Sequence, residues 1–138
     1  MTKHYSTMEA KRISNPTILI VDDSSLNARI LSSWCAKWGF IADVALSGKS
    51  AIEKAYNHDY SLIILDILLP DISGFQVFEE LSVYRPQMNV IFQSGISKEE
   101  FRSKIKREAF FLQKPYYPAE MKELIEFNFE KTNIKMLA

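Results

Sequence analysis

The sequence predicts an α/β fold in which five helices cover both faces of a doubly wound, five-stranded parallel sheet with the strand order 2-1-3-4-5. Three observations support this prediction. Short apolar runs alternate along the chain with segments whose apolar residues recur at helical spacing. The runs are almost continuously apolar, as expected of strands buried on both faces. Polar side chains gather directly after the runs, where parallel strands present their carboxyl ends at one edge.

The first half of the chain contains three of the predicted strands and two of the helices. Residues 17–21 are a β-branched run and form the first strand. The first helix ends near Gly39, and its apolar positions recur at helical spacing: Leu26, Ile30, Leu31, Trp34 and Trp38. Residues 40–46 form the second strand, and a second helix follows with the same spacing: Ala51, Ile52, Ala55 and Tyr56. Residues 61–65 form the third strand.

The third helix and the fourth strand come next. Ser73 or Gly74 opens the helix, which ends before Pro86. Its buried face carries three apolar residues: Phe75, Phe78 and Leu81. Residues 89–93 have an apolar centre, Val90 to Phe92, with a polar residue at each end, and we predict that they form the fourth strand.

The last two helices enclose the fifth strand. Ser97, with Glu100 three residues later, has the form of a capping box and opens the fourth helix. Residues 109–113 form the fifth strand. Pro118 suits the first turn of the fifth helix, whose apolar positions follow it: Met121, Leu124, Ile125 and Phe129.

Length and composition exclude several classes of protein. Residues 1–15 are polar and aperiodic, so we expect a flexible N-terminal segment followed by one folded domain over 16–138. Basic residues and acidic residues number 17 each, and a formal net charge of zero argues against a nucleic-acid partner. No apolar run has the length of a membrane span or the form of a signal-peptide core. Cys35 is a lone cysteine, which favours a reducing compartment, and we expect a cytoplasmic protein.

Several polar residues follow the predicted strands at the same edge of the sheet. Asp22 and Asp23 follow the first strand, and Asp66 follows the third. These strands are neighbours in the order 2-1-3-4-5, so three carboxylates meet at the point where the strand order reverses. A hard divalent cation such as Mg²⁺ would relieve their repulsion. Ser94 after the fourth strand adds a hydroxyl, and Lys114 after the fifth adds an ammonium.

Each of these residues has a simpler interpretation when taken alone. An aspartate after a strand is more often a helix cap or turn residue, a serine such as Ser94 a loop hydroxyl, and a lysine such as Lys114 a solvated charge. Because these groups all lie at one edge of the sheet, a shared functional site is favoured over these separate interpretations. Acids, a cation site, a hydroxyl and a lysine together favour a site for phosphoryl transfer.

Four segments carry a resemblance to a known family: ILIVDDS, LIILDILLPDISG, FQSG and LQKP. In their order and spacing they resemble the receiver domains of two-component response regulators, which have a flavodoxin-like fold of the CheY type. The resemblance covers about residues 17–130. It implies that Asp66 is a phosphoacceptor, which takes a phosphoryl group from the phosphohistidine of a sensor histidine kinase or a phosphotransfer protein.

The resemblance also implies a Mg²⁺ site around the phosphoacceptor. Asp23 corresponds to the direct ligand, and Asp22 to an acid that acts mainly through bound water. The backbone carbonyl of Leu68 and the carboxylate of Asp66 complete the expected set. Such a domain catalyses only its own phosphorylation and dephosphorylation, so we do not expect an enzyme in the usual sense.

The response to phosphorylation is expected to involve three further residues. Ser94 would hydrogen-bond the phosphoryl group, while Lys114 would pair with both Asp66 and a phosphoryl oxygen. Ser94 and Phe111 correspond to the family's switch pair, although Phe111 cannot donate a hydrogen bond. No output domain is expected within the chain. Signalling to a downstream protein is therefore expected through the face formed by the fourth helix, fifth strand and fifth helix, and a phosphorylation-dependent homodimer there is left open.

Two apolar residues are expected to set the lifetime of the phosphorylated state. Leu68 and Ile96 occupy the positions two residues after the phosphoacceptor and two residues after the conserved hydroxyl. Polar residues there can orient a water for attack on the acyl phosphate, whereas branched apolar side chains exclude it. We therefore expect a persistent phosphorylated state.

Three alternatives come from other classes. A degenerate receiver would act as a phosphorylation-independent interaction module, yet all the acidic, hydroxyl and lysine positions are intact. A phosphatase of the haloacid dehalogenase type needs a second aspartate where this chain has Leu68. A flavodoxin-like electron carrier needs a phosphate-binding loop in place of residues 22–25.

Overall fold

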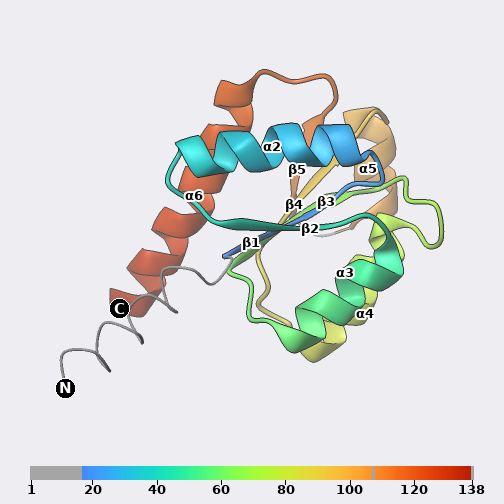
Figure 1. The fold of residues 1–138 in the computed structure, drawn as a ribbon. Coiled ribbons are helices and arrows are strands. Elements are labelled where there is room, and N and C mark those ends of the chain that lie inside the picture. Colours follow the sequence, from blue (N-terminus) through green and yellow to red (C-terminus); the bar gives the residue numbers. More distant parts are fainter. Residues whose placement is uncertain (1–16, 107, 138) are drawn as a thin grey trace.

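The computed structural model describes residues 17–106 and 108–137, and it confirms the predicted fold class. A five-stranded parallel sheet has the order β2-β1-β3-β4-β5 (Figure 1). The segment 1–15, predicted to be flexible, lies outside the described residues. Within the part of the chain that is described, no helix is both long and apolar enough to cross a membrane.

The elements alternate along the chain as predicted. The strands are β1 (Ile18–Val21), β2 (Ala42–Ala45), β3 (Leu62–Asp66), β4 (Val90–Ser94) and β5 (Phe110–Gln113). The helices are α2 (Ser25–Lys37), α3 (Gly48–Asn57), α4 (Gly74–Tyr84), α5 (Lys98–Lys104) and α6 (Pro118–Leu137). Strands β3 and β4 each end one residue later than predicted. Asp66 and Ser94 are therefore the last residues of strands and are held by the sheet itself.

Two apolar layers cover the sheet, one on each face. Helices α3, α4 and α5 pack on one face, and α2 and α6 on the other. Successive side chains of a strand point to opposite faces, so Leu19 and Val21 belong to the first layer while Ile18 and Ile20 belong to the second. All four are fully buried. This burial on both faces explains why the strands appear in the sequence as continuous apolar runs.

Serine residues begin four of the helices. In each, the serine hydroxyl accepts the backbone N–H three residues later, which satisfies one of the free donors of the first turn: Ser24, Ser47, Ser73 and Ser97. Of the capping box predicted at Ser97 and Glu100, the structure has the serine bond, with Oγ 3.1 Å from the Glu100 nitrogen. The complete reciprocal box instead joins Ser73 and Gln76 at the start of α4.

Two glycines serve the backbone in different ways. Gly39 has a φ of 91° and follows the end of α2, in agreement with its predicted role as a helix stop. Gly74 begins α4, and its N–H donates to the Ile67 carbonyl at 2.8 Å. A Cβ atom on Gly74 would lie only 2.2 Å from the backbone oxygen of Asp66. Only glycine allows α4 to start so close to the end of β3.

Candidate phosphoryl-transfer site

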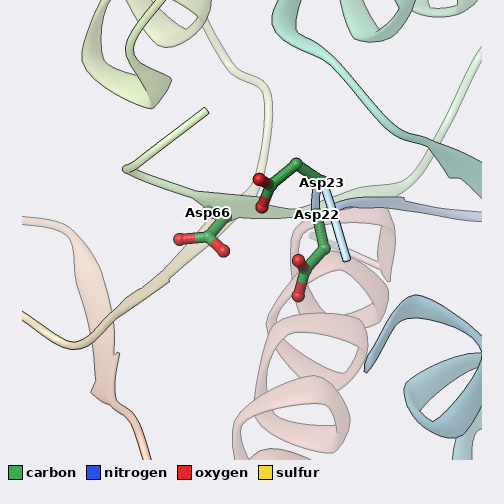
Figure 2. Close-up of side chains that lie close together, drawn as sticks. All are labelled: Asp22, Asp23 and Asp66. Atoms are coloured by element: carbon green, nitrogen blue, oxygen red, sulfur yellow. The ribbon is translucent and has the colours of Figure 1, made fainter. Parts of the chain in front are cut away.

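Three carboxylates meet at the carboxyl ends of β1 and β3. Figure 2 shows Asp22 and Asp23, which follow β1, close to Asp66 at the end of β3. Each contributes an oxygen, and these oxygens all lie within 4.8 Å of one another. Asp22 and Asp66 are buried, whereas Asp23 is exposed. The sheet order thus brings together acids that are more than 40 residues apart in the chain.

Lys114 supplies the one ammonium that is paired with this cluster in the described residues. Its Nζ lies 2.9 Å from Oδ2 of Asp66 and 3.1 Å from Oδ2 of Asp22. Its backbone N–H donates to the Ser94 carbonyl at 2.7 Å, which ties the segment after β5 to the end of β4. Three carboxylates and one ammonium leave an excess of negative charge. The site therefore attracts a further cation.

Burial and charge shift the pKa values of the central pair. Burial raises the pKa of Asp66, and the Asp22 carboxylate adds to this effect, although Lys114 and the Leu68 N–H oppose it. Burial alone would lower the pKa of Lys114. Hydrogen bonds and charge interactions with Asp66 and Asp22 outweigh it and hold that pKa above its ordinary value. Lys114 is therefore charged at neutral pH and faces Asp66 as an ammonium.

The donor set fits a hard divalent cation. Asp22 already has both oxygens engaged, because Oδ1 accepts the Ser24 N–H at 2.9 Å and Oδ2 accepts from Lys114. Within residues 17–106 and 108–137, the Asp23 carboxylate has no hydrogen-bond or salt-bridge partner. An exposed, unengaged carboxylate beside two buried ones offers the oxygen ligands that Mg²⁺ prefers, with room for its waters.

Both predicted switch residues are buried, Ser94 at the end of β4 and Phe111 within β5. The Ser94 hydroxyl accepts the Ile96 N–H at 3.3 Å. Phe111 is stacked on Phe101 of α5, with ring centroids 4.4 Å apart and an interplanar angle of 14°. Phe92 of β4 continues the contact at 5.3 Å from Phe101. The Phe111 side chain is thus packed inward, against the layer of α3, α4 and α5.

The two residues expected to set the lifetime lie in different environments. Leu68 is 64% exposed, so most of its side chain contacts solvent. Ile96 is half-buried and packs against the layer of α3, α4 and α5. Exclusion of water by this pair remains a prediction.

Sequence reasoning missed the role of Asp71 in the loop after β3. Its two carboxylate oxygens accept the N–H groups of Gly48 at 2.9 Å and Lys49 at 2.8 Å, at the start of α3. These bonds, led by the one from Lys49, lower the pKa of Asp71 to about 2. The loop that carries Leu68 is thereby anchored to a neighbouring helix. The only signal in the sequence was an acidic residue two positions before Ser73, the cap of α4, and it does not point to α3.

A second missed contact joins β4 to the loop after β5. The hydroxyl of Tyr116 donates to Oε1 of Gln93 at 2.5 Å. An open hollow of about 470 Å³ lies beside this pair, between α2 and Lys114, and its wall includes Trp34 and Pro115. The signal in the sequence was a glutamine inside a predicted buried strand.

Comparison with known proteins gives consistent matches. Residues 18–126 match the family model of the response regulator receiver domain. Over 70 residues, 51% of this chain, the chain is 39% identical to the aerobic respiration control sensor protein ArcB of Escherichia coli (strain K12). Over 87 residues, 63% of the chain, it is 32% identical to the transcriptional regulatory protein CusR of the same organism. The matched parts make up 9% and 38% of those proteins, so the chain spans less than half of either.

The fold is also similar to solved structures. A response regulator receiver domain protein (CheY-like) from Methanospirillum hungatei JF-1 superposes with a TM-score of 0.79 at 25% sequence identity. The match covers 88% of this chain and 99% of that one. Strand order, acidic cluster and overall shape thus agree with one family.

Proposed function

The chain belongs to the response regulator receiver domain family, and on that premise we propose that it accepts a phosphoryl group onto Asp66 in a Mg²⁺-dependent reaction. The observation that carries the proposal is the pairing of the Asp66 carboxylate with the Lys114 ammonium at 2.9 Å, beside two further acids. The domain extends over residues 16–138. The phosphoryl donor is a phosphohistidine of a sensor kinase or a phosphotransfer protein, and the reaction takes place in the cytoplasm.

The reaction is a phosphoryl transfer between two protein side chains. A carboxylate oxygen of Asp66 attacks the phosphorus in line with the P–N bond of the phosphohistidine. The P–N bond breaks, its electron pair stays on the imidazole nitrogen, and Asp66 becomes an acyl phosphate. Asp23, Asp66 and the Leu68 carbonyl would hold Mg²⁺ directly and Asp22 would act mainly through bound water; the ion would supply positive charge to the phosphoryl oxygens.

Lys114 and Ser94 act on the phosphoryl group from the protein side. The Lys114 ammonium offsets charge on one phosphoryl oxygen, because it is already held between Asp22 and Asp66. The Ser94 hydroxyl is buried beside the cluster and donates to another phosphoryl oxygen once it turns from the Ile96 N–H. Turning Ser94 pulls on the segment that leads into α5. That movement is the first local consequence of phosphorylation.

The output surface is the face formed by α5, β5 and α6. The end of α5 and the residues after it are basic and exposed: Arg102, Lys104 and Lys106. The first turns of α6 carry exposed acids: Glu120, Glu123 and Glu126. A hollow of about 410 Å³ lies between β5 and α6; Glu120 and Glu123 line it, and Phe127 at its wall is 50% exposed. This combination suits a protein partner, and the opposite charges at the end of α5 and along the first turns of α6 also suit a second copy of the chain.

Analytical ultracentrifugation with and without beryllofluoride, a phosphoryl mimic, distinguishes these partners. Association that requires the mimic supports a homodimer. A monomer in both states leaves only other proteins as partners.

Incubation with acetyl phosphate and Mg²⁺ tests the phosphoacceptor proposal. The wild type is expected to gain one phosphoryl group per chain, which appears in the intact mass and disappears in base. Asp66→Asn is expected to gain none, whereas Asp59→Asn, which alters an exposed carboxylate in the loop before β3, is expected to label like the wild type. Equal labelling of wild type and Asp66→Asn would overturn the assignment of Asp66. A wild type that gains no phosphoryl group would leave the alternative, a phosphorylation-independent interaction module.

A further inference from the structure

Gln93 is a polar residue in a mainly apolar layer. It is 1% exposed and lies in β4, two residues after Ile91, so both side chains point to the face covered by α2 and α6. A buried amide without a partner destabilises a protein, and an apolar residue would pack there without that cost. A glutamine at this place therefore calls for an explanation beyond packing.

Tyr116 provides the partner of this amide. Its hydroxyl donates to Gln93 Oε1 at 2.5 Å. Burial raises the pKa of Tyr116 above its ordinary range, and the negative charge of Asp22 adds to the effect. The phenol thus keeps its proton at any physiological pH. The hydrogen bond has a fixed direction, from Tyr116 to Gln93.

The pair lies at the base of the lysine that faces the phosphoacceptor. Lys114 precedes Tyr116 by two residues, and its own N–H donates to the carbonyl of Ser94 at 2.7 Å. The backbone is therefore tied to two successive residues of β4, at Lys114 itself through Ser94 and just beyond it through Gln93. A lysine side chain has four flexible bonds, so a fixed backbone narrows the range of positions that its ammonium can reach.

We propose that Gln93 and Tyr116 are a positioning pair, which holds the backbone around Lys114 so that its ammonium meets Asp66 and the incoming phosphoryl group. This inference rests on the proposed function. Neither side chain is catalytic, because both act through Lys114. Loss of the pair is expected to slow phosphorylation while the acidic cluster itself stays intact.

Two single variants and one double variant test the pair. Tyr116→Phe leaves the buried Gln93 oxygen without its donor, and Gln93→Leu leaves the hydroxyl of the half-buried Tyr116 without its acceptor. Each variant is expected to label from acetyl phosphate about tenfold more slowly than the wild type. Tyr117→Phe is the matched control, since Tyr117 is the adjacent residue and is 78% exposed. It is expected to label at the wild-type rate.

The double variant Gln93→Leu/Tyr116→Phe separates positioning from stability. Replacing both polar partners by apolar groups removes the unsatisfied atom, so urea unfolding is expected to return close to the wild-type midpoint. The labelling rate is nevertheless expected to stay low, because the tie to β4 is still absent. A rate that recovers together with the stability would overturn the proposal and leave a packing role only.

A further set of variants tests whether the slower labelling depends on Lys114. In a Lys114→Ala background, which labels slowly itself, Gln93→Leu is expected to cause no further loss. The same tenfold loss in that background would contradict the inference, as would wild-type rates in both single variants. A wild type that does not label at all would instead overturn the proposed function, and with it this inference. The two proposals can thus fail separately.

Discussion

Replacing Gly74 by alanine should disturb both the fold and the site, because the position has no space for a side chain. The added Cβ would stand 2.2 Å from the backbone oxygen of Asp66 and 2.9 Å from the Cα of Ile67. A carbon and an oxygen atom make ordinary van der Waals contact at about 3.4 Å. The backbone at the start of α4 must therefore move about 1 Å away from the end of β3. Both neighbours are backbone atoms, and no flexible side chain can move aside.

The expected loss of stability is about 2–3 kcal/mol, near the upper end of what overpacking usually costs. A gain of about 0.5–1 kcal/mol from replacing a helical glycine by alanine opposes it only in part. The same shift moves the backbone that carries the Asp66 carboxylate. A displacement of 1 Å at reacting groups slows reactions on the order of 100-fold, and we expect a loss of that size in phosphorylation.

Gly95→Ala is the control, since no atom lies within 4 Å of a Cβ built at Gly95, only one residue after Ser94. Urea unfolding gives the stability of both variants, and labelling with acetyl phosphate under folded conditions gives their rates. If Gly74→Ala unfolds and labels like Gly95→Ala, then α4 does not constrain the end of β3 and the reasoning fails.

Three further predictions concern lifetime, pH and metal. Phospho-Asp66 in the wild type should decay one to two orders of magnitude more slowly than in a Leu68→Asn/Ile96→Glu double variant, about 1.4–2.7 kcal/mol of barrier, as followed after removal of the donor. Asp71 has a pKa of about 2 in the folded protein, below its unfolded value, so its contribution is complete above pH 4 or so and disappears as the pH falls toward 2. Urea midpoints of wild type and Asp71→Asn should therefore differ at neutral pH and converge in acid. Asp23→Ala should weaken Mg²⁺ binding, as measured by tryptophan fluorescence, because its carboxylate is the unengaged one.

Each of these predictions can fail independently. Equal decay in the wild type and the double variant would show that the apolar pair does not control water, and the 64% exposure of Leu68 makes this test a demanding one. A stability difference for Asp71→Asn that persists unchanged at pH 2 would show that the carboxylate charge is not what holds α3. Undiminished Mg²⁺ affinity in Asp23→Ala would show that the ion does not bind the cluster through this residue.

The sheet could be predicted from the sequence because the signals that mark a strand are local. A run buried on both faces is recognisable from its own residues, and the polar residues at its end mark the edge where the site lies. The ends of β3 and β4 were placed one residue early for the same reason. Asp66 and Ser94 are polar and resemble loop residues, yet the ladder continues through them, with Asp66 opposite Gln93 and Ser94 opposite Gln113.

The missed contacts depend on where separate loops meet. Asp71 and Gly48 are 23 residues apart, as are Gln93 and Tyr116. No periodicity relates such pairs, and the path of a loop is set by the packing of the elements that it joins. The inward packing of Phe111 likewise depends on which aromatic rings of the neighbouring elements reach it, and the sequence alone does not give side-chain directions.

Reduction of the phosphorylated protein with borohydride tests the central claim most directly. Borohydride converts an aspartyl phosphate to homoserine, which peptide mass spectrometry then locates in the sequence. We predict homoserine at position 66, only after incubation with donor and Mg²⁺, and at no other aspartate. Homoserine at position 22, 23 or 71, or none at all after full labelling, would contradict the assignment of Asp66 as the phosphoacceptor.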